Sequence, residues 1–173
     1  NAQEIINTLH RSGIVNCTMI TGDDEGAART AASRTGIDHY ISRALPEDKV
    51  AYISKQKKAG HKVIMIGDGI NDAPALATAD AGIAMGDSAA ITGETADIVL
   101  SADDGLEGVV KIRTMGTRLM QKIDSNNTSI VVVNTALMFG GLLGFLPPAT
   151  AALFHNLSTI LFSAKAAQPL LKK

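Results

Sequence analysis

Aromatic residues are scarce in this chain of 173 residues: they make up 3% of it, and tryptophan is absent. Proteins that bind single-stranded nucleic acid stack the bases on aromatic side chains, so we expect no nucleic-acid partner. Cysteine occurs once, as Cys17, which excludes a disulfide framework within the chain and a cysteine-rich zinc site. Apolar residues nevertheless make up 46% of the sequence, which is enough for a packed core.

Charge is missing from one long stretch of the sequence. No Asp, Glu, Lys or Arg occurs from Ser125 to Ala164, which is 40 positions, and a transmembrane helix needs roughly 20 apolar residues. Residues 1–110 carry 16 acidic and 9 basic residues, whereas residues 111–173 carry 1 acidic and 7 basic residues. We therefore expect a charged soluble unit followed by a transmembrane α-helical hairpin in contact with membrane lipid. The alternative is a buried helical hairpin of a soluble protein.

The first part of the chain alternates between helical and extended patterns. Apolar spacing and Gly or Pro signals predict helices at residues 3–9, 25–35, 46–59 and 72–79. Short apolar runs predict strands at residues 17–20, 37–41, 63–66, 82–85 and 98–100. Short strands separated by helices indicate an α/β fold with a mainly parallel, Rossmann-type sheet.

The second part is predicted to be helical. An amphipathic connecting helix is expected at residues 105–125, followed by membrane spans at about 128–146 and 149–171, with Pro147 and Pro148 at the turn. Basic residues flank the hairpin and the turn is uncharged, so the positive-inside rule places both flanks in the cytoplasm. The chain begins at Asn1 rather than Met, and we expect it to be part of a longer protein.

Two polar turns follow predicted strands, where ligands bind in open α/β sheets. In the first, Thr21 offers a hydroxyl and Gly22 allows a phosphate to approach the backbone beside Asp23. In the second, Asp68 and Asp72 lie four residues apart, a pattern that suits Mg²⁺, a cation that prefers oxygen ligands.

A lysine accompanies these turns. Lys49 lies just inside the helix that Pro46 begins, and a lysine near phosphate and Mg²⁺ would neutralise charge during phosphoryl transfer. Taken alone, Lys49 is more often a solvated surface charge and Asp68 a helix cap. The order of the three elements, each placed after a strand, favours a phosphate site.

The motifs resemble those of P-type ATPases. Residues 67–76 read GDGINDAPAL, which is similar to the hinge motif of that family. Residues 21–23 resemble its phosphate-holding turn and residues 46–49 its lysine segment. Residues 155–159, His-Asn-Leu-Ser-Thr, resemble the final helix of the heavy-metal-transporting branch. The order of the motifs is that of the haloacid-dehalogenase fold.

The resemblance implies a role for each matching residue. Asp68 would bind Mg²⁺, with Asn71 and Asp72 supporting the phosphate and the metal. Thr21 and Asp23 would hold the phosphoryl group, Gly22 would give backbone access to it, and Lys49 would stabilise its charge. ATP would be the phosphoryl donor, and the nucleotide site would lie mostly outside this chain.

The departures from the family pattern define a fragment. The chain has no Asp-Lys-Thr-Gly-Thr segment, because Asp48 and Lys49 are followed by Val50, so the aspartate that forms the phosphoenzyme is missing. The nucleotide-binding and actuator domains are missing as well. Residues 1–104 would be the C-terminal part of a phosphorylation domain, residues 105–125 a connecting helix, and residues 126–173 two membrane helices.

Polar residues within the uncharged stretch form a second candidate site. His155 and Thr159 fall on one helical face, and Asn127 and Asn134 lie roughly on one face of the preceding helix. Imidazole with amide or hydroxyl oxygens suits a borderline divalent metal such as Zn²⁺, Co²⁺, Fe²⁺ or Mn²⁺. The alternative is hydrogen bonding between helices. The other histidines, His10, His39 and His61, show no ligand spacing and are expected at the surface.

These observations lead to one preferred function and two alternatives. We expect part of an ATP-driven heavy-metal transporter of the plasma membrane, whose phosphorylation domain and C-terminus are cytoplasmic. Its partners would be the transported metal and the remaining domains of the pump, and the fragment alone would be inactive. The alternatives are a soluble haloacid-dehalogenase-type phosphatase, or a membrane-anchored regulator without catalytic activity.

Overall fold

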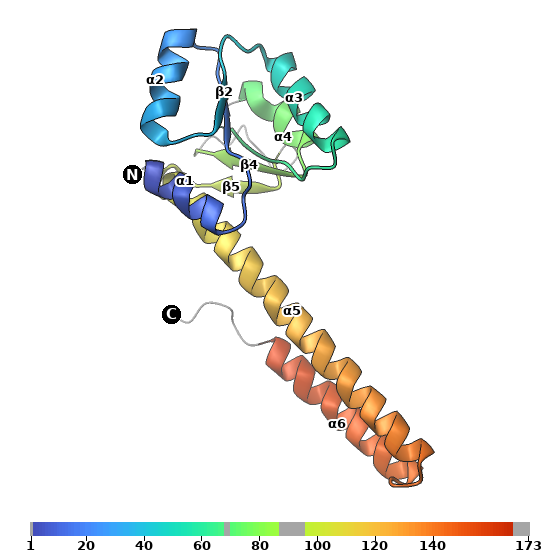
Figure 1. Ribbon diagram of the computed structural model, residues 1–173. Coiled ribbons are helices and arrows are strands. Elements are labelled where there is room, and N and C mark those ends of the chain that lie inside the picture. Colours follow the sequence, from blue (N-terminus) through green and yellow to red (C-terminus); the bar gives the residue numbers. More distant parts are fainter. Residues whose placement is uncertain (1, 68–69, 87–95, 168–173) are drawn as a thin grey trace. The chain divides into compact units, whose positions relative to one another are not determined.

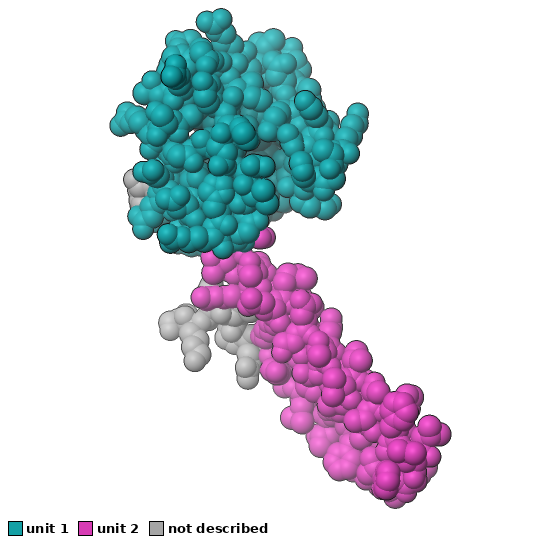
Figure 2. Space-filling model, in the orientation of Figure 1, with its two compact units in different colours: residues 1–111 teal, residues 112–173 magenta. Residues whose placement is uncertain are grey.

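The computed structural model describes residues 2–67, 70–86 and 96–167. The chain divides into two compact units, residues 1–111 and residues 112–173 (Figure 2). Helix α5 (Gly105–Leu142) is shared between the two units, and every other element belongs to one of them.

Unit 1 alternates strands and helices, as the sequence predicts (Figure 1). Its elements, in chain order, are α1 (Ala2–Arg11), β1 (Thr18–Ile20), α2 (Glu25–Thr35), β2 (His39–Ile41), α3 (Pro46–Lys58), β3 (Ile64–Gly67), α4 (Ala73–Thr78), β4 (Ala81–Met85) and β5 (Ile98–Leu100). Short 3₁₀ turns at Ile70–Asp72 and Ala102–Asp104 precede α4 and α5, and α5 begins at Gly105.

All strand pairs in unit 1 that the structure describes are parallel, and they form two sheets. One contains β1 and β2, with Thr18 opposite His39, and the other has the order β3-β4-β5, with Ile64 opposite Ala81 and Ile83 opposite Ile98. Within the described residues, β1 pairs only with β2 and β3 only with β4. The prediction of a mainly parallel α/β fold is confirmed. In each sheet one edge strand leads into a predicted polar turn: β1 into residues 21–23, and β3 into residues 67–72.

Local sequence signals set the helix boundaries of unit 1. Asp24 precedes α2 and its side chain accepts a hydrogen bond from the Ala27 N–H at 3.0 Å, which satisfies a donor that the first helical turn leaves free. Gly36 ends α2 with φ of 71°, a left-handed conformation that favours glycine. Pro46 opens α3, where its missing N–H costs no helical hydrogen bond.

The core of unit 1 is made of small and medium-sized side chains. Ile53 and Leu76 are the largest side chains that are fully buried, and Leu76 packs with Ala84, Ala96 and Met65. A Cβ added at Gly82 would lie 2.8 Å from the Leu76 carbonyl oxygen, so this glycine allows β4 and α4 to pack closely.

Unit 2 is a helical hairpin. Helix α5 (Gly105–Leu142) runs without interruption from unit 1 into unit 2, and α6 (Pro148–Ala166) lies beside it (Figure 1). The Asn126 side-chain amide donates to the Phe162 carbonyl at 3.3 Å, and Lys122 Nζ donates to the Ala166 carbonyl at 3.0 Å. Residues 143–147 join the two helices, and Pro148, which was predicted to lie in the turn, is the first residue of α6.

The prediction that this hairpin spans a membrane is not supported. Among the helices that the structure describes, none combines the length and the apolar character that crossing a bilayer requires. The prediction rested on the absence of charge between residues 125 and 164, but neutral polar side chains also lower hydropathy. Asn126, Asn127 and Asn134 in α5, and His155 and Asn156 in α6, are side chains of this kind.

Candidate functional site

The first predicted turn, residues 21–23, directly follows β1 and is internally hydrogen-bonded. Thr21 Oγ1 donates to Asp23 Oδ2 at 2.7 Å, and the Asp23 N–H donates to Thr21 Oγ1 at 3.2 Å. Gly22 and Asp23 are exposed and Thr21 is half-buried. The turn therefore presents a hydroxyl, a carboxylate and backbone groups to an incoming ligand.

A second segment holds this turn in place. The Arg43 N–H donates to the Asp23 carbonyl at 2.8 Å, and the Ala44 N–H donates to the Thr21 carbonyl at 2.9 Å. Arg43 has φ of 51°, a left-handed conformation that is uncommon for a residue with a side chain. Because Pro46 begins α3 two residues after Ala44, the same segment ties the turn at residues 21–23 to the helix that carries Lys49.

Lys49 and Asp72 form an ion pair in unit 1. Lys49 Nζ lies 2.6 Å from Asp72 Oδ1, and the two side chains are 19% and 10% exposed. Lys49 is in the first turn of α3, whereas Asp72 follows β3 and precedes α4. The fold thus joins two of the predicted motifs that lie 23 positions apart in the sequence.

Close packing fixes the Asp72 carboxylate. A Cβ added at Gly67 would lie 2.7 Å from the Asp72 Cβ and 2.8 Å from its Oδ2, so only glycine leaves room for Asp72 at this position. Asp72 is 7% exposed and is the one buried charged residue in the part of the chain that the structure describes. A charge-assisted hydrogen bond from Lys49 compensates for this burial.

The second predicted turn contains two further predicted site residues, Asn71 and Asp68. Asn71 is exposed on the 3₁₀ turn beside Asp72. Asp68, the predicted Mg²⁺ ligand, lies outside the described residues. The structure therefore brings together Lys49 and Asp72, and it holds the turn at Thr21 and Asp23 close to the start of α3.

The hairpin brings two of its four predicted metal contacts together. His155 Nδ1 lies 2.9 Å from Asn134 Oδ1, whereas the Thr159 hydroxyl donates to the His155 carbonyl within α6 at 3.0 Å. Asn127 is exposed on α5. If the amide oxygen of Asn134 accepts the proton of Nδ1, the Nε2 atom of His155 keeps a free lone pair.

A carboxylate network that the sequence did not predict joins α2 to the end of β2. The Ser42 hydroxyl donates to Glu25 Oε2 at 2.6 Å, and the Tyr40 hydroxyl donates to Glu25 Oε1 at 2.7 Å. These two hydrogen bonds lower the pKa of Glu25, with the Ser42 bond contributing most. The sequence offers no signal for this network, since it depends on α2 packing beside the end of β2.

Residues 1–80 match the haloacid dehalogenase-like hydrolase family. The unit with parallel strands therefore contains a domain of that class.

The relatives extend the likeness over nearly the whole chain. A manganese-exporting P-type ATPase of Mycobacterium leprae (strain TN) is 40% identical over 160 residues, which are 92% of this chain and 22% of that protein. A zinc-exporting P-type ATPase of Mycobacterium marinum (strain ATCC BAA-535 / M) is 39% identical over 160 residues, with the same coverage.

A solved structure of a P-type ATPase is also similar to this chain over nearly its whole length. The structure of a zinc-transporting PIB-type ATPase in the E2.Pi state matches with a TM-score of 0.84 and 32% identity, covering 98% of this chain and 27% of that chain. The chain therefore matches heavy-metal P-type ATPases over nearly its whole length. It spans about a fifth of the length of the curated relatives that it matches.

Proposed function

We propose that this chain is part of an ATP-driven pump for heavy-metal cations, in which unit 1 supplies the side chains that handle the phosphoryl group. The single observation that carries this proposal is the Lys49 and Asp72 pair at 2.6 Å. It joins two predicted sequence motifs that lie 23 positions apart. A pump is favoured over a soluble phosphatase because the likeness covers 92% of the chain and therefore includes most of the helical hairpin.

The side chains of unit 1 have distinct roles in this proposal. The Thr21 hydroxyl and the backbone beside Gly22 bind phosphoryl oxygens, and the ammonium of Lys49 neutralises their charge. Asp72 holds Lys49 in place through the hydrogen bond to its Oδ1 atom. The aspartate that accepts the phosphoryl group comes from a part of the pump outside this sequence, since no Asp-Lys-Thr-Gly-Thr segment is present.

The donor set of the second turn fits Mg²⁺. The Asp72 carboxylate and the exposed Asn71 amide are hard oxygen donors, and Mg²⁺ is bound by one or two carboxylates together with substrate oxygens. We propose Asp68 and Asp72 as the carboxylates that hold it and Asn71 as a contact to phosphate or metal. When bound, Mg²⁺ supplies positive charge to the transferring phosphoryl oxygens.

The transported ion is proposed to contact the hairpin. His155 and Asn134 lie together and offer an imidazole nitrogen and an amide oxygen, donors that suit a borderline divalent metal. Thr159 is one turn further along α6, and Asn127 lies on α5. In the whole pump, an integral protein of the plasma membrane, unit 1 faces the cytoplasm and ATP.

A chimeric pump tests the phosphoryl-transfer role. In the manganese-exporting relative, this chain would replace the 160 residues to which it is similar. We expect Lys49→Ala to lower metal-stimulated ATP hydrolysis at least about 100-fold, since one lost charge-stabilising donor costs roughly that much.

The matched control is Lys58→Ala, an exposed lysine at the end of α3, which should leave the rate unchanged. Equal activity of the Lys49 and Lys58 variants, at equal expression, would contradict the proposal.

A further inference from the structure

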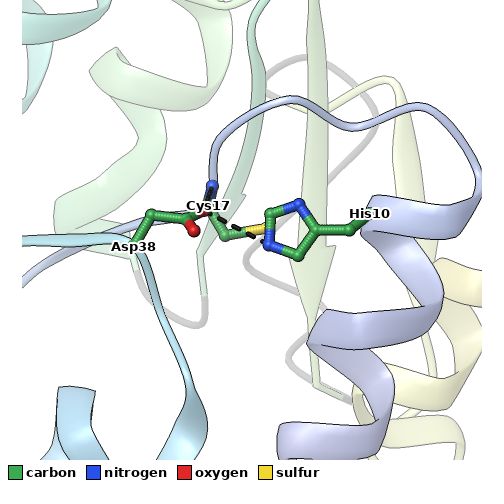
Figure 3. Close-up of side chains that lie close together, drawn as sticks. All are labelled: His10, Cys17 and Asp38. Carbon is green, nitrogen blue, oxygen red and sulfur yellow. Dashed lines mark hydrogen bonds and ion pairs between the residues drawn. The ribbon is translucent and has the colours of Figure 1, made fainter.

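The strongest unexplained cluster in unit 1 combines a histidine, a cysteine and a carboxylate. Ligand atoms of His10, Cys17 and Asp38 all lie within 4.8 Å of one another (Figure 3). His10 is near the end of α1, Cys17 directly precedes β1 and Asp38 directly precedes β2. The sequence predicted His10 to be a surface residue without ligand neighbours, but the structure shows it half-buried beside two of them.

The cluster is separate from the proposed phosphate site. Because β1 and β2 are parallel and Thr18 is opposite His39, Cys17 and Asp38 meet at the amino-terminal ends of the two strands. The turn at Thr21 follows the carboxyl end of β1, four residues beyond Cys17 and therefore roughly 13 Å further along at about 3.3 Å per residue. Any ligand of the cluster therefore binds at the opposite edge of this sheet.

Hydrogen bonding orients the imidazole of His10. Its Nδ1 atom lies 2.9 Å from the Ile14 carbonyl oxygen, which can only accept, so Nδ1 carries the proton. Nε2 then faces Asp38 Oδ2 at 3.3 Å. In the neutral imidazole this places two lone pairs opposite each other, an arrangement that a cation between them would stabilise. Metal-binding histidines donate their second ring N–H to a carbonyl in the same way.

The Asp38 carboxylate is also held in place, by a hydrogen bond from the backbone of Cys17. Asp38 Oδ2 accepts a hydrogen bond from the Cys17 N–H at 2.6 Å, which fixes it beside the cysteine. Ligands of tetrahedral Zn²⁺, at about 2.0–2.3 Å from the metal, lie roughly 3.3–3.7 Å from one another. The His10 and Asp38 atoms already have this spacing, so a Zn²⁺ ion would require a shift of about an ångström in the Cys17 side chain.

We infer that His10, Cys17 and Asp38 form a binding site for a borderline divalent cation of the Zn²⁺ type. One nitrogen, one sulfur and one oxygen donor suit Zn²⁺ or Co²⁺ better than Mg²⁺. The side chains of His10 and Asp38 are 29% and 33% exposed, so solvent can supply a fourth ligand. A bound cation would tie the end of α1 to the starts of β1 and β2.

A free reactive thiol is a less suitable interpretation of Cys17. Burial raises the pKa of this thiol, and the negative charge of Asp38 raises it further, which keeps it protonated when no cation is present. A reactive cysteine needs the opposite, an electropositive surrounding that lowers the pKa.

Cobalt titration of the full chain tests the site, with Co²⁺ as a spectroscopic substitute for Zn²⁺. We expect a thiolate-to-cobalt charge-transfer band that saturates at one ion per chain and is displaced by Zn²⁺. Cys17→Ala should abolish the band, and His10→Ala should weaken Co²⁺ binding at least 10-fold. His61→Ala is the matched control, because His61 lies outside the cluster and bonds to Gln56; it should bind as the parent chain does.

A second measurement avoids substitutions that could disturb folding. One equivalent of Zn²⁺ should slow alkylation of Cys17 by iodoacetamide at least 10-fold in the unmodified chain. The absence of a charge-transfer band together with unchanged alkylation would overturn the inference. This result is independent of the phosphoryl-transfer proposal, since neither measurement involves Lys49 or ATP.

Discussion

The burial of the Asp72 side chain depends on two other residues, Gly67 and Lys49. Gly67 provides the space for its carboxylate, and Lys49 provides the charge that makes its burial tolerable. Removing one member of a buried ion pair leaves the other without compensation in a medium of low dielectric constant, which costs more than the pair itself contributes.

We expect Lys49→Met to lower the free energy of unfolding by about 1–3 kcal/mol, less than for a fully enclosed pair because both side chains retain some solvent contact. Urea denaturation would measure it, with Lys58→Met as the control. Adding Asp72→Asn to the Lys49→Met chain should restore part of the loss, because the uncompensated charge is then gone. A double variant no more stable than Lys49→Met would argue against a buried pair.

At the scale of elements, hydrogen bonds between side chains join α2 to the end of β2. Glu25 in the first turn of α2 accepts from Ser42 and Tyr40, so the carboxylate form is favoured in the folded state and its pKa is lowered. A lowered pKa in the folded state means that this stabilisation is complete at neutral pH. It is lost when the pH falls below the ordinary glutamate pKa of about 4.3 and through the lower folded value.

We therefore expect the stability of Glu25→Gln to fall less steeply than that of the parent chain between about pH 5 and pH 3. Urea unfolding at several pH values would measure both slopes. Glu47→Gln, an exposed residue of α3, serves as the control and should follow the parent curve. Identical slopes for Glu25→Gln and the parent would show that these hydrogen bonds do not favour the ionised form.

The sequence predicted the bounds of helices well where those bounds depend on neighbouring residues. The helix start at Pro46, the helix over residues 25–35 and the break between the last two helices all depend on neighbouring residues. The first two lie where they were predicted, whereas the break lies at residues 143–147, just before Pro148. The membrane spans were predicted from missing charge, and the structure does not support them. Hydropathy is a sum over all side chains, so amides and imidazoles count even when they carry no charge.

At the scale of the whole molecule, the proposed phosphoryl-transfer site is incomplete within this sequence. Strands β1 and β3 each pair on one side only in the part of the chain that the structure describes, and the sequence has no phosphorylatable Asp-Lys-Thr-Gly-Thr segment. In the proposed function the nucleophile is the aspartate of that segment, so the proposed charge-stabilising groups would have no covalent step to assist in this chain alone.

This chain by itself should therefore form no acid-stable phosphoenzyme from γ-labelled ATP, with or without Mg²⁺ and heavy-metal ions. The chimeric pump with an intact aspartate segment serves as the positive control under the same conditions. Incorporation of label into this chain, abolished by an Asp72→Asn substitution, would disprove the assignment of the nucleophile to another part of the pump.

The sequence by itself determined the order of strands and helices, the parallel α/β class and the motifs at residues 21–23, 46–49 and 67–76, because these features depend on local patterns. Only the tertiary structure placed Lys49 against Asp72 and gathered His10, Cys17 and Asp38 at the start of two strands. Such contacts depend on strand register and helix packing, which bring together residues that are far apart in the chain. Spacing along the sequence carries no measure of those distances in space.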